Sequence, residues 1–293
     1  MKIVVLAFCA RDKYQCARLL SWLIQLGISR DSWGKEHHLI LAHSRNTDLR
    51  GLEATSRLAF GEVTEFIPQD ENESGWWVSC NHLWWRTVEE MERLKSPFLW
   101  LEPDVVPLRP DFLDVLWREY QAMPPTSILA KKLSFKLIDS GEPTFGQVYQ
   151  SDEGWKRVFP AQLVAAPREF QVLSGIGIYP AETRAILENI DIAGPPFNAV
   201  CSQRLASRCH HTSAILEAKP SRPIIRLTFE DVRHFPEDAC LFHPCKDGTV
   251  IRLLTYLQLG LTKEPDDPNK NLTWSDGLAA IARSRRRRLP VNL

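Results

Sequence analysis

The chain has 293 residues and a mass of 33.6 kDa, and 44% of its residues are hydrophobic and 25% charged. These proportions are ordinary for a globular protein, and the length suits one large α/β domain or two small ones. The 36 basic side chains balance the 36 acidic ones, so no net charge selects nucleic acid or a membrane surface.

The first half of the chain alternates between strand and helix patterns. Continuous apolar runs predict strands that are buried on both faces, and apolar residues at helical spacing predict helices. We expect Gly27 to end the first helix and Ser79 to cap the second. The predicted elements are a strand at 2–12, a helix at 14–27, strands at 37–44 and 61–69, a helix at 79–95, a strand at 97–106 and a helix at 109–121.

The second half of the chain is less regular. Frequent prolines and few apolar runs predict long loops around short strands at 124–172. Beyond these loops we expect a strand and a helix at 170–190, a helix at 195–206, and a strand, a polar turn and a helix at 239–260. This order of elements predicts an α/β fold with a mostly parallel central sheet flanked by helices.

No segment marks the chain for a membrane or for export. No apolar run approaches the ~20 residues that a membrane-spanning helix needs, and the apolar start is too short for a signal peptide. The seven cysteines include no Cys-x-x-Cys pair, which favours free thiols over a zinc site. We therefore predict a cytoplasmic protein without a membrane partner.

Two acids follow the predicted strand at 97–106, in the stretch "FLWLEPDVVPL". In parallel sheets, ligands bind beyond the carboxyl ends of the strands, which makes Glu102 and Asp104 functional candidates. One carboxylate can bind a divalent cation such as Mg²⁺ or Mn²⁺ while the other holds a neighbouring group. A solvated turn is the alternative, and we expect Pro107 and Pro110 to stop further strand pairing.

Two other stretches carry candidate chemistry. "HPCKDG" places His243, which can bind a metal, three residues before Lys246, which can bind phosphate, although an ordinary Asp-Gly turn is the alternative. "LSGIGIYP" contains Gly175 and Gly177, where the backbone must approach a ligand or another strand closely. No Gly-x-Gly-x-x-Gly follows the first strand, which disfavours a dinucleotide-dependent redox enzyme.

Together, these motifs resemble the GT-A class of nucleotide-sugar glycosyltransferases over roughly residues 1 to 255. "FLWLEPDVVPL" is similar to the Asp-x-Asp motif of that class, with Glu102 in place of the first aspartate, and "LFHPCKDG" is similar to its His-x-x-Lys element. "LSGIGIYP" is similar to its acceptor-side strand. The resemblance implies one GT-A-like, Rossmann-related domain at 1–262 and a C-terminal extension with a basic tail at 263–293.

The resemblance also implies roles for single residues around a nucleoside-diphosphate sugar. Asp104, Glu102 and His243 would hold the divalent cation, Mn²⁺ or Mg²⁺, with Glu102 also near the ribose. Asp104 and Lys246 would be catalytic, because Lys246 would neutralise the leaving diphosphate. The implied donor-binding residues are Ala7, Arg11, Asp12, Asn81, Glu102 and Lys246.

The catalytic base stays open at this point. Inverting members of the class carry an acid near the start of the helix after the acceptor strand, where this chain has Asn198. Either Asp191 or another carboxylate serves as the base, or the enzyme is retaining and needs none. On the acceptor side we expect Gly175, Gly177, Asn198, Trp76 and Trp77, with both tryptophans in a polar loop before the helix at 79–95.

The acceptor is either DNA that carries a hydroxymethylated base, as in phages, or a saccharide. Five arginines at 283–288, Trp76 and Trp77, and three lysines make DNA worth testing, whereas the zero net charge argues against it. These lysines are Lys131, Lys132 and Lys136. A proline-interrupted segment at 139–170, with Asp152, Trp155, Lys156 and Phe159, is a candidate acceptor-binding loop.

Two alternatives come from other classes of protein. A nucleotidyltransferase would use the same metal chemistry but would normally show a glycine-rich basic loop after the first strand, and "AFCARDKYQ" has no glycine. A non-catalytic nucleotide-sugar-binding module would not need the two acids, the histidine and the lysine together.

Overall fold

The computed structural model describes residues 1–28, 36–69, 76–136, 169–187, 197, 207–217 and 227–261. Contacts divide the chain into two compact units. The first comprises residues 1–225 and 238–244, and the second comprises residues 226–237 and 245–293. The predicted extension at 263–293 lies outside the described residues, so its boundary stays a prediction.

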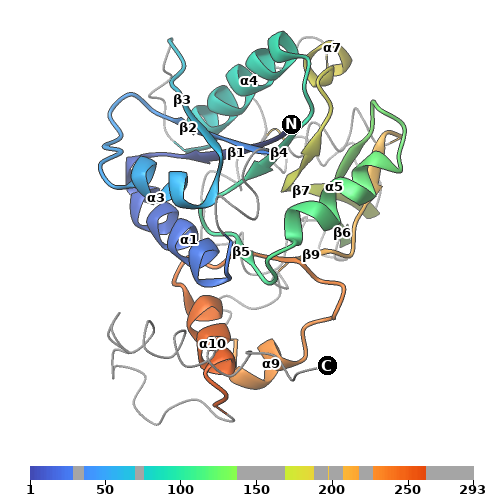
Figure 1. Ribbon diagram of the computed structural model, residues 1–293. Helices are drawn as coiled ribbons and strands as arrows, with labels where there is room; N and C mark the ends of the chain where they lie inside the picture. Colours follow the sequence, from blue (N-terminus) through green and yellow to red (C-terminus); the bar gives the residue numbers. More distant parts are fainter. Residues whose placement is uncertain are drawn as a thin grey trace, which may run out of the picture. The chain divides into compact units, whose positions relative to one another are not determined.

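A seven-stranded sheet forms the centre of the first unit (Figure 1). In order across the sheet, its strands are β3 (Glu62–Phe66), β2 (His37–His43), β1 (Lys2–Phe8), β4 (Phe98–Leu101), β7 (Glu169–Tyr179), β6 (Ile128–Lys136) and β8 (Cys209–His211). Strands β3, β2, β1 and β4 pair in parallel, as do β6 and β8, whereas β7 is antiparallel to both of its neighbours. The predicted α/β fold with a mostly parallel sheet is therefore confirmed.

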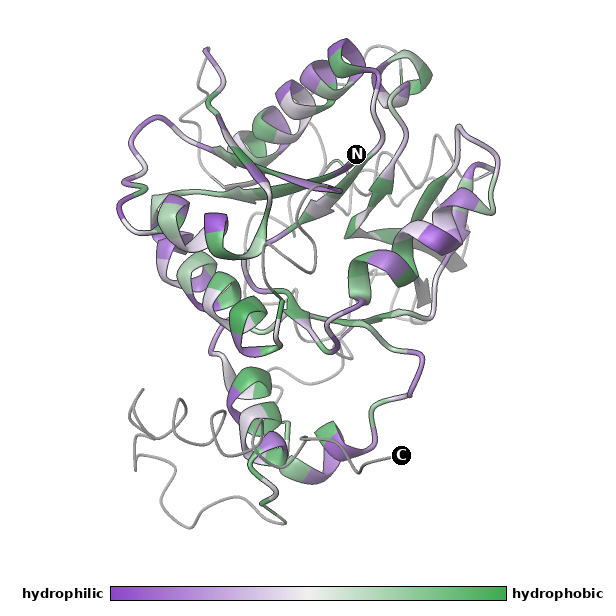
Figure 2. Cartoon of the chain, in the orientation of Figure 1, coloured by the Kyte–Doolittle hydropathy of each residue, from purple (hydrophilic) through white to green (hydrophobic). Residues whose placement is uncertain are grey.

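Helices cover both faces of this sheet (Figure 1). They are η1 (Ala10–Asp12), α1 (Lys13–Gln25), α3 (Leu52–Ala59), α4 (Trp76–Leu94), α5 (Phe112–Gln121) and α7 (Thr183–Leu187). Alternate residues of β1 point to opposite faces: Val4 and Leu6 pack with α1, α3 and α5, whereas Ile3 and Val5 pack with α4. Because both faces are buried, the strand is apolar after Lys2, and Figure 2 draws it mostly in green.

A second, three-stranded sheet belongs to the same unit. It consists of β5 (Val106–Pro107), β10 (Leu241–His243) and β9 (Ile215–Glu217), in that order. Strand β10 is antiparallel to β5 and parallel to β9. The prediction that Pro107 ends strand pairing is wrong, because Pro107 pairs with Leu241 and the next N–H, that of Leu108, donates to the Cys240 carbonyl at 2.9 Å.

Several predicted boundaries also need correction. Helix α4 begins at Trp76, so Trp76 and Trp77 lie in its first turn rather than in a loop before it, and Ser79 lies inside the helix. Helix α3 was not predicted, since its eight residues give too short an apolar pattern. Strand β6, with nine residues, lies in the region where we expected long loops around short strands, and it is longer than expected. Of the predicted helix at 195–206, only Phe197 is described.

The second unit contains two described helices, α9 (Phe229–Arg233) and α10 (Thr249–Gln258). Phe229 and Val232 of α9 pack with Leu253 and Tyr256 of α10 in a small core. Gly248, with a φ of 77°, provides the left-handed residue before α10, which agrees with the predicted polar turn and helix. Among the described helices, none is long and apolar enough to cross a bilayer, and a cytoplasmic location stays a prediction.

Candidate metal centre

The segment between β4 and β5 links the two sheets of the first unit. Strand β4 ends at Leu101, and the Val105 N–H then donates to the Glu102 carbonyl at 3.2 Å, which closes a tight turn around Pro103 and Asp104. The chain next enters β5 of the smaller sheet. The two acids after the buried strand therefore lie in the turn where the chain leaves one sheet for the other.

The antiparallel pairing of β5 with β10 brings His243 to this turn. Val106 pairs with Phe242, so the residue before Val106 lies next to the residue after Phe242. The start of β5 and the end of β10 are thus neighbours, although they are far apart in the chain. This pairing explains how residues 102–104 and residue 243 come to share one site.

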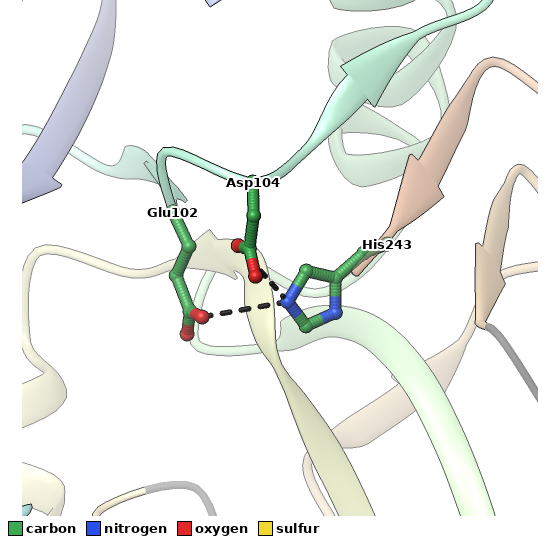
Figure 3. Close-up of side chains that lie close together, drawn as sticks. All are labelled: Glu102, Asp104 and His243. Carbon is green, nitrogen blue, oxygen red and sulfur yellow. Dashed lines mark ion pairs between the residues drawn. The ribbon is translucent and has the colours of Figure 1, made fainter. Parts of the chain in front are cut away.

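The side chains of Glu102, Asp104 and His243 point toward one another (Figure 3). The imidazole Nε2 of His243 lies 3.4 Å from Oε2 of Glu102 and 3.5 Å from Oδ1 of Asp104. The Asp104 side chain is 6% exposed, that of His243 14% and that of Glu102 36%. The cluster is therefore buried on the Asp104 side and open to solvent on the Glu102 side.

A fourth side chain contacts the other edge of the histidine ring. Glu217, at the end of β9, pairs in register with His243, and its Oε2 and Oε1 lie 3.0 and 3.2 Å from Nδ1 of His243. Ser174 of β7 donates a hydrogen bond from its hydroxyl to Oε1 of Glu217. The imidazole thus lies between one carboxylate on its Nδ1 side and two on its Nε2 side.

The electrostatics of the cluster favour positive charge. Burial works to lower the pKa of His243, whereas the negative charge of Glu217 works to raise it. Contacts with the carboxylates of Asp104, Glu102 and Glu217 add to the second effect, and the pKa ends well above its usual value of 6.5. Three carboxylates around one imidazole therefore stabilise its protonated, positively charged form.

The donor set fits a divalent metal ion. Glu102, Asp104 and His243 each offer one ligand atom, and these three atoms lie within 4.8 Å of one another. Ligands at right angles around an ion with bonds of ~2.1 Å are separated by about 3 Å, which is close to the 3.4 and 3.5 Å measured from Nε2. Two carboxylates with one imidazole suit Mn²⁺ and also accept Mg²⁺.

The two glycines predicted on the acceptor side lie in β7 and have different neighbours. A Cβ on Gly175 would lie 2.5 Å from Oε1 of Glu102, so the missing side chain leaves room for that carboxylate. A Cβ on Gly177 would lie 2.5 Å from the Leu129 carbonyl oxygen and 2.8 Å from Cβ of Ala130. Gly175 thus approaches the candidate metal centre and Gly177 the neighbouring strand, while acceptor binding by either stays a prediction.

Of the predicted donor-binding residues, Glu102 belongs to the metal cluster, and the others are not among its three members. Ala7 is buried at the end of β1 and Arg11 is exposed in η1. Asp12 accepts hydrogen bonds from the backbone N–H and the thiol of Cys9, at 3.3 and 3.0 Å. Asn81 is buried, and its amide oxygen accepts a hydrogen bond from the Phe197 N–H at 2.9 Å, which is a structural contact. Their donor-binding roles stay predictions.

Other predicted site residues cannot be placed at the cluster. Asp191, Asn198 and all but the last two residues of the candidate loop at 139–170 lie outside the described residues. Lys246 belongs to the second unit and is exposed, so its predicted role rests on its position three residues after His243 in the sequence. The backbone of Trp76 and Trp77 begins α4.

Sequence reasoning missed Glu217 and Ser174. The signal for Glu217 is weak: Ile215 and Leu216 precede it, as an apolar run precedes Glu102, but two apolar residues do not define a strand. Ser174 gives no signal beyond its place next to Gly175. Both were missed because their role depends on how strands distant in sequence pair.

Comparison with known proteins identifies fold neighbours only. No protein-family profile matches the sequence, and no curated protein matches it. Among solved structures, the chain is similar to the galactosyltransferase LgtC in complex with donor and acceptor sugar analogues, with 10% identity over 90% of this chain and 98% of that one and a TM-score of 0.47. It is likewise similar to mouse xyloside xylosyltransferase 1 in its apo form, with 10% identity over 83% and 96% of the two chains and a TM-score of 0.47.

A further neighbour is glucosyl-3-phosphoglycerate synthase from Mycobacterium tuberculosis, solved in complex with Mn²⁺, uridine diphosphate and glucosyl-3-phosphoglycerate. It shares 14% identity over 72% of this chain and 68% of its own, with a TM-score of 0.40. These neighbours are sugar-transferring enzymes and a sugar-conjugate synthase. At such identities and scores, the similarity assigns neither a family nor an activity to this chain.

Proposed function

We propose that the protein is a metal-dependent glycosyltransferase that moves a sugar from a nucleoside-diphosphate sugar to a hydroxyl acceptor. The observation that carries this proposal is the convergence of Glu102, Asp104 and His243 at the ends of β4 and β10. Such a donor set suits Mn²⁺ or Mg²⁺, and both ions are commonly completed by phosphate oxygens. The sequence resemblance to the GT-A class then favours sugar transfer among the reactions that use a metal and a diphosphate.

In the proposed reaction, the bond from the anomeric carbon to the diphosphate oxygen breaks, and a bond from the acceptor oxygen to that carbon forms. A divalent ion would stabilise the negative charge that develops on the diphosphate. Glu102, Asp104 and His243 would hold that ion. Lys246 would add a second positive charge, and Arg11 would lie near the nucleoside, with Ala7, Asp12 and Asn81 as the other predicted donor contacts.

The acceptor hydroxyl must lose its proton during the transfer. Asp191 is the candidate base if the enzyme inverts the configuration of the sugar, whereas in a retaining enzyme an oxygen of the departing diphosphate would take the proton instead. For the acceptor we keep two classes, a saccharide and a hydroxymethylated base in DNA. Lys131, Lys132 and Lys136, all on β6, are the described basic residues that motivate the DNA class.

The test is donor turnover by the purified chain. Nucleotide sugars with different bases and sugars are incubated with the chain in Mn²⁺ or in EDTA. Each incubation is made without an acceptor, with oligosaccharides, and with duplex DNA carrying 5-hydroxymethylpyrimidines. We expect release of the nucleoside diphosphate in Mn²⁺, faster with the right acceptor, and none in EDTA. Binding to such DNA should weaken steeply with salt and on removal of residues 283–293 if DNA is the acceptor.

The same assay separates the alternatives. A nucleotidyltransferase would join a nucleoside triphosphate to a sugar phosphate and release pyrophosphate. A binding module would bind the nucleotide sugar without turning it over. Either result would overturn the proposal. Glu65→Gln provides a matched control variant, because Glu65 also contacts a histidine at a strand end but lies outside the metal cluster.

A further inference from the structure

Strand β7 is irregular where it passes the candidate metal centre. Leu173 pairs with Lys132 and Gly177 pairs with Ala130, so three residues of β7, at 174–176, face one residue of β6. Irregularities of this kind redirect side chains and are common next to active sites. Two of the three residues have a contact at the centre: Ser174 contacts Glu217, and Gly175 leaves room for Glu102.

Ser174 and Glu217 form a buried pair behind His243. The Glu217 side chain is 9% exposed and Ser174 is buried. The serine hydroxyl donates to Oε1 of Glu217, and both Glu217 oxygens face Nδ1 of the imidazole. A carboxylate that is removed from water needs such partners, because its burial is otherwise unfavourable. The pair is therefore a built arrangement that joins β7, β9 and β10.

The ring geometry gives this pair a defined role. Nδ1 and Nε2 lie on opposite edges of the imidazole, and Glu217 faces Nδ1 whereas Glu102 and Asp104 face Nε2. An Nδ1–H that donates to Glu217 leaves the Nε2 lone pair for a metal ion. A carboxylate in this position fixes the tautomer and the orientation of a ligating histidine.

We propose that Glu217, held by Ser174, is the positioning residue that orients His243 and thereby sets the affinity and the metal preference of the centre. The inference rests on the metal-binding part of the proposed function. Glu217 is not a fourth ligand in this arrangement, because the group of converging ligand atoms found among the described residues consists of Glu102, Asp104 and His243. Its carboxylate acts through the imidazole ring.

The test measures metal binding directly on the full chain, without any substrate. Mn²⁺ binding is followed by the loss of the free-ion EPR signal, and Mg²⁺ binding by competition. Loss of a group that orients a ligand typically weakens metal affinity about 10- to 100-fold. We expect that loss of Mn²⁺ affinity for Glu217→Ala, a smaller loss for Glu217→Gln, whose amide oxygen still accepts from Nδ1–H, and a loss of a few fold for Ser174→Ala.

Metal preference distinguishes positioning from general loosening of the fold. An imidazole ligand favours Mn²⁺ over Mg²⁺, because Mg²⁺ prefers oxygen ligands. Glu217→Ala should therefore weaken Mn²⁺ more than Mg²⁺, as His243→Ala should, and Glu65→Gln should change neither. Thermal unfolding of each variant checks that it is folded. If Glu217→Ala does not fold, the single variants Glu217→Gln and Ser174→Ala provide the same comparison of metal affinities.

Three results would overturn the inference. The first is an unchanged Mn²⁺ affinity in a folded Glu217→Ala variant, and the second is an equal loss of affinity for Mn²⁺ and for Mg²⁺. The third is a loss of turnover at unchanged Mn²⁺ affinity, which would mean that Glu217 contacts the substrate. Failure of the proposed function gives a different pattern. If the chain binds Mn²⁺ with the expected variant effects but transfers no sugar, glycosyl transfer alone is refuted. If it transfers sugar in EDTA and does not bind Mn²⁺, the inference about Glu217 is refuted.

Discussion

Two histidines end buried strands in the first unit, and their surroundings differ. His43, the last residue of β2, is 1% exposed, and its Nδ1 lies 2.8 Å from the Ser44 carbonyl and its Nε2 2.9 Å from Glu65. His243, the last residue of β10, has one carboxylate at Nδ1, while its Nε2 faces two carboxylates at 3.4 and 3.5 Å. The two distances at His43 are typical of hydrogen bonds, whereas the two distances at Nε2 of His243 are longer.

This difference shows what makes a strand-end histidine suitable for a metal. Both nitrogens of His43 are satisfied by single oxygens at hydrogen-bond distance, so its contacts hold β2, β3 and the following turn together. Nε2 of His243 faces two carboxylates across a gap that suits an ion. The second carboxylate is available because β5 and β10 pair in a sheet of their own, whereas among the described strands β2 pairs with β1 and β3 of the larger sheet.

The largest expected effect comes from Asp104, which is the most buried of the three candidate ligands. Asp104→Asn keeps the size of the side chain but removes its charge, so we expect donor turnover in Mn²⁺ to fall by about 10²- to 10³-fold. The measurement is nucleoside-diphosphate release, with Glu65→Gln as the control that keeps full turnover. Full activity of Asp104→Asn in EDTA would contradict the metal centre.

The two histidines should respond to substitution in opposite ways. His243→Ala should weaken Mn²⁺ binding at least tenfold with little change in unfolding temperature, since the ring lies at a strand end. His43→Ala should leave Mn²⁺ binding unchanged but lower the free energy of unfolding by about 1–3 kcal/mol, because a buried, hydrogen-bonded ring is lost. Thermal unfolding and Mn²⁺ titration of both variants check this, and identical behaviour would remove the distinction.

The two glycines of β7 extend the same contrast with smaller effects. Gly175→Ala should displace the Glu102 carboxylate and weaken Mn²⁺ binding a few fold, because that carboxylate ends a flexible side chain that can move. Gly177→Ala meets the Leu129 backbone, which cannot move easily, and should destabilise the fold by about 1–3 kcal/mol without affecting Mn²⁺. Chemical unfolding and Mn²⁺ titration separate the two outcomes, and a metal effect of Gly177→Ala would argue against this division.

The smallest expected effect concerns His38, in the same strand as His43. Burial lowers the pKa of His38 below 6.5, and the charge of Glu62 opposes this only in part. The unfolded chain therefore binds a proton at His38 before the folded chain does, and stability falls as the pH drops below 6.5. His38→Gln should flatten that part of the stability profile, measured by chemical unfolding at several pH values, and should not change Mn²⁺ affinity at neutral pH.

Glu102 and Asp104, just after β4, and His243, at the end of β10, could be identified as candidate ligands because their signals are local. An apolar run that ends in acids, and another that ends in a histidine, each indicate a buried strand with a polar end. The alternating strand and helix patterns predicted the parallel part of the sheet for the same reason. Gly27, with a φ of 85°, follows the first helix as expected.

The rest of the site depends on contacts that the sequence does not encode locally. Glu217 ends a three-residue strand, and Ser174 reaches it from an irregular stretch of β7, so neither stands out before the strands are paired. The pairing of Pro107 was missed because a missing N–H was taken to end the ladder, although the next residue supplies a donor. Trp76 and Trp77 were misplaced because Ser79 was taken as the helix cap, whereas α4 begins three residues earlier.

The link between β5 and β10 also bears on when the centre can form during synthesis. Glu102 and Asp104 leave the ribosome long before His243, and pairing of such distant segments is slow because a long loop must close first. A nascent chain that ends before β10 carries two carboxylates without the imidazole. We therefore expect the proposed ion to bind only after β10 has been made, so that metal loading would follow the synthesis of all the described strands.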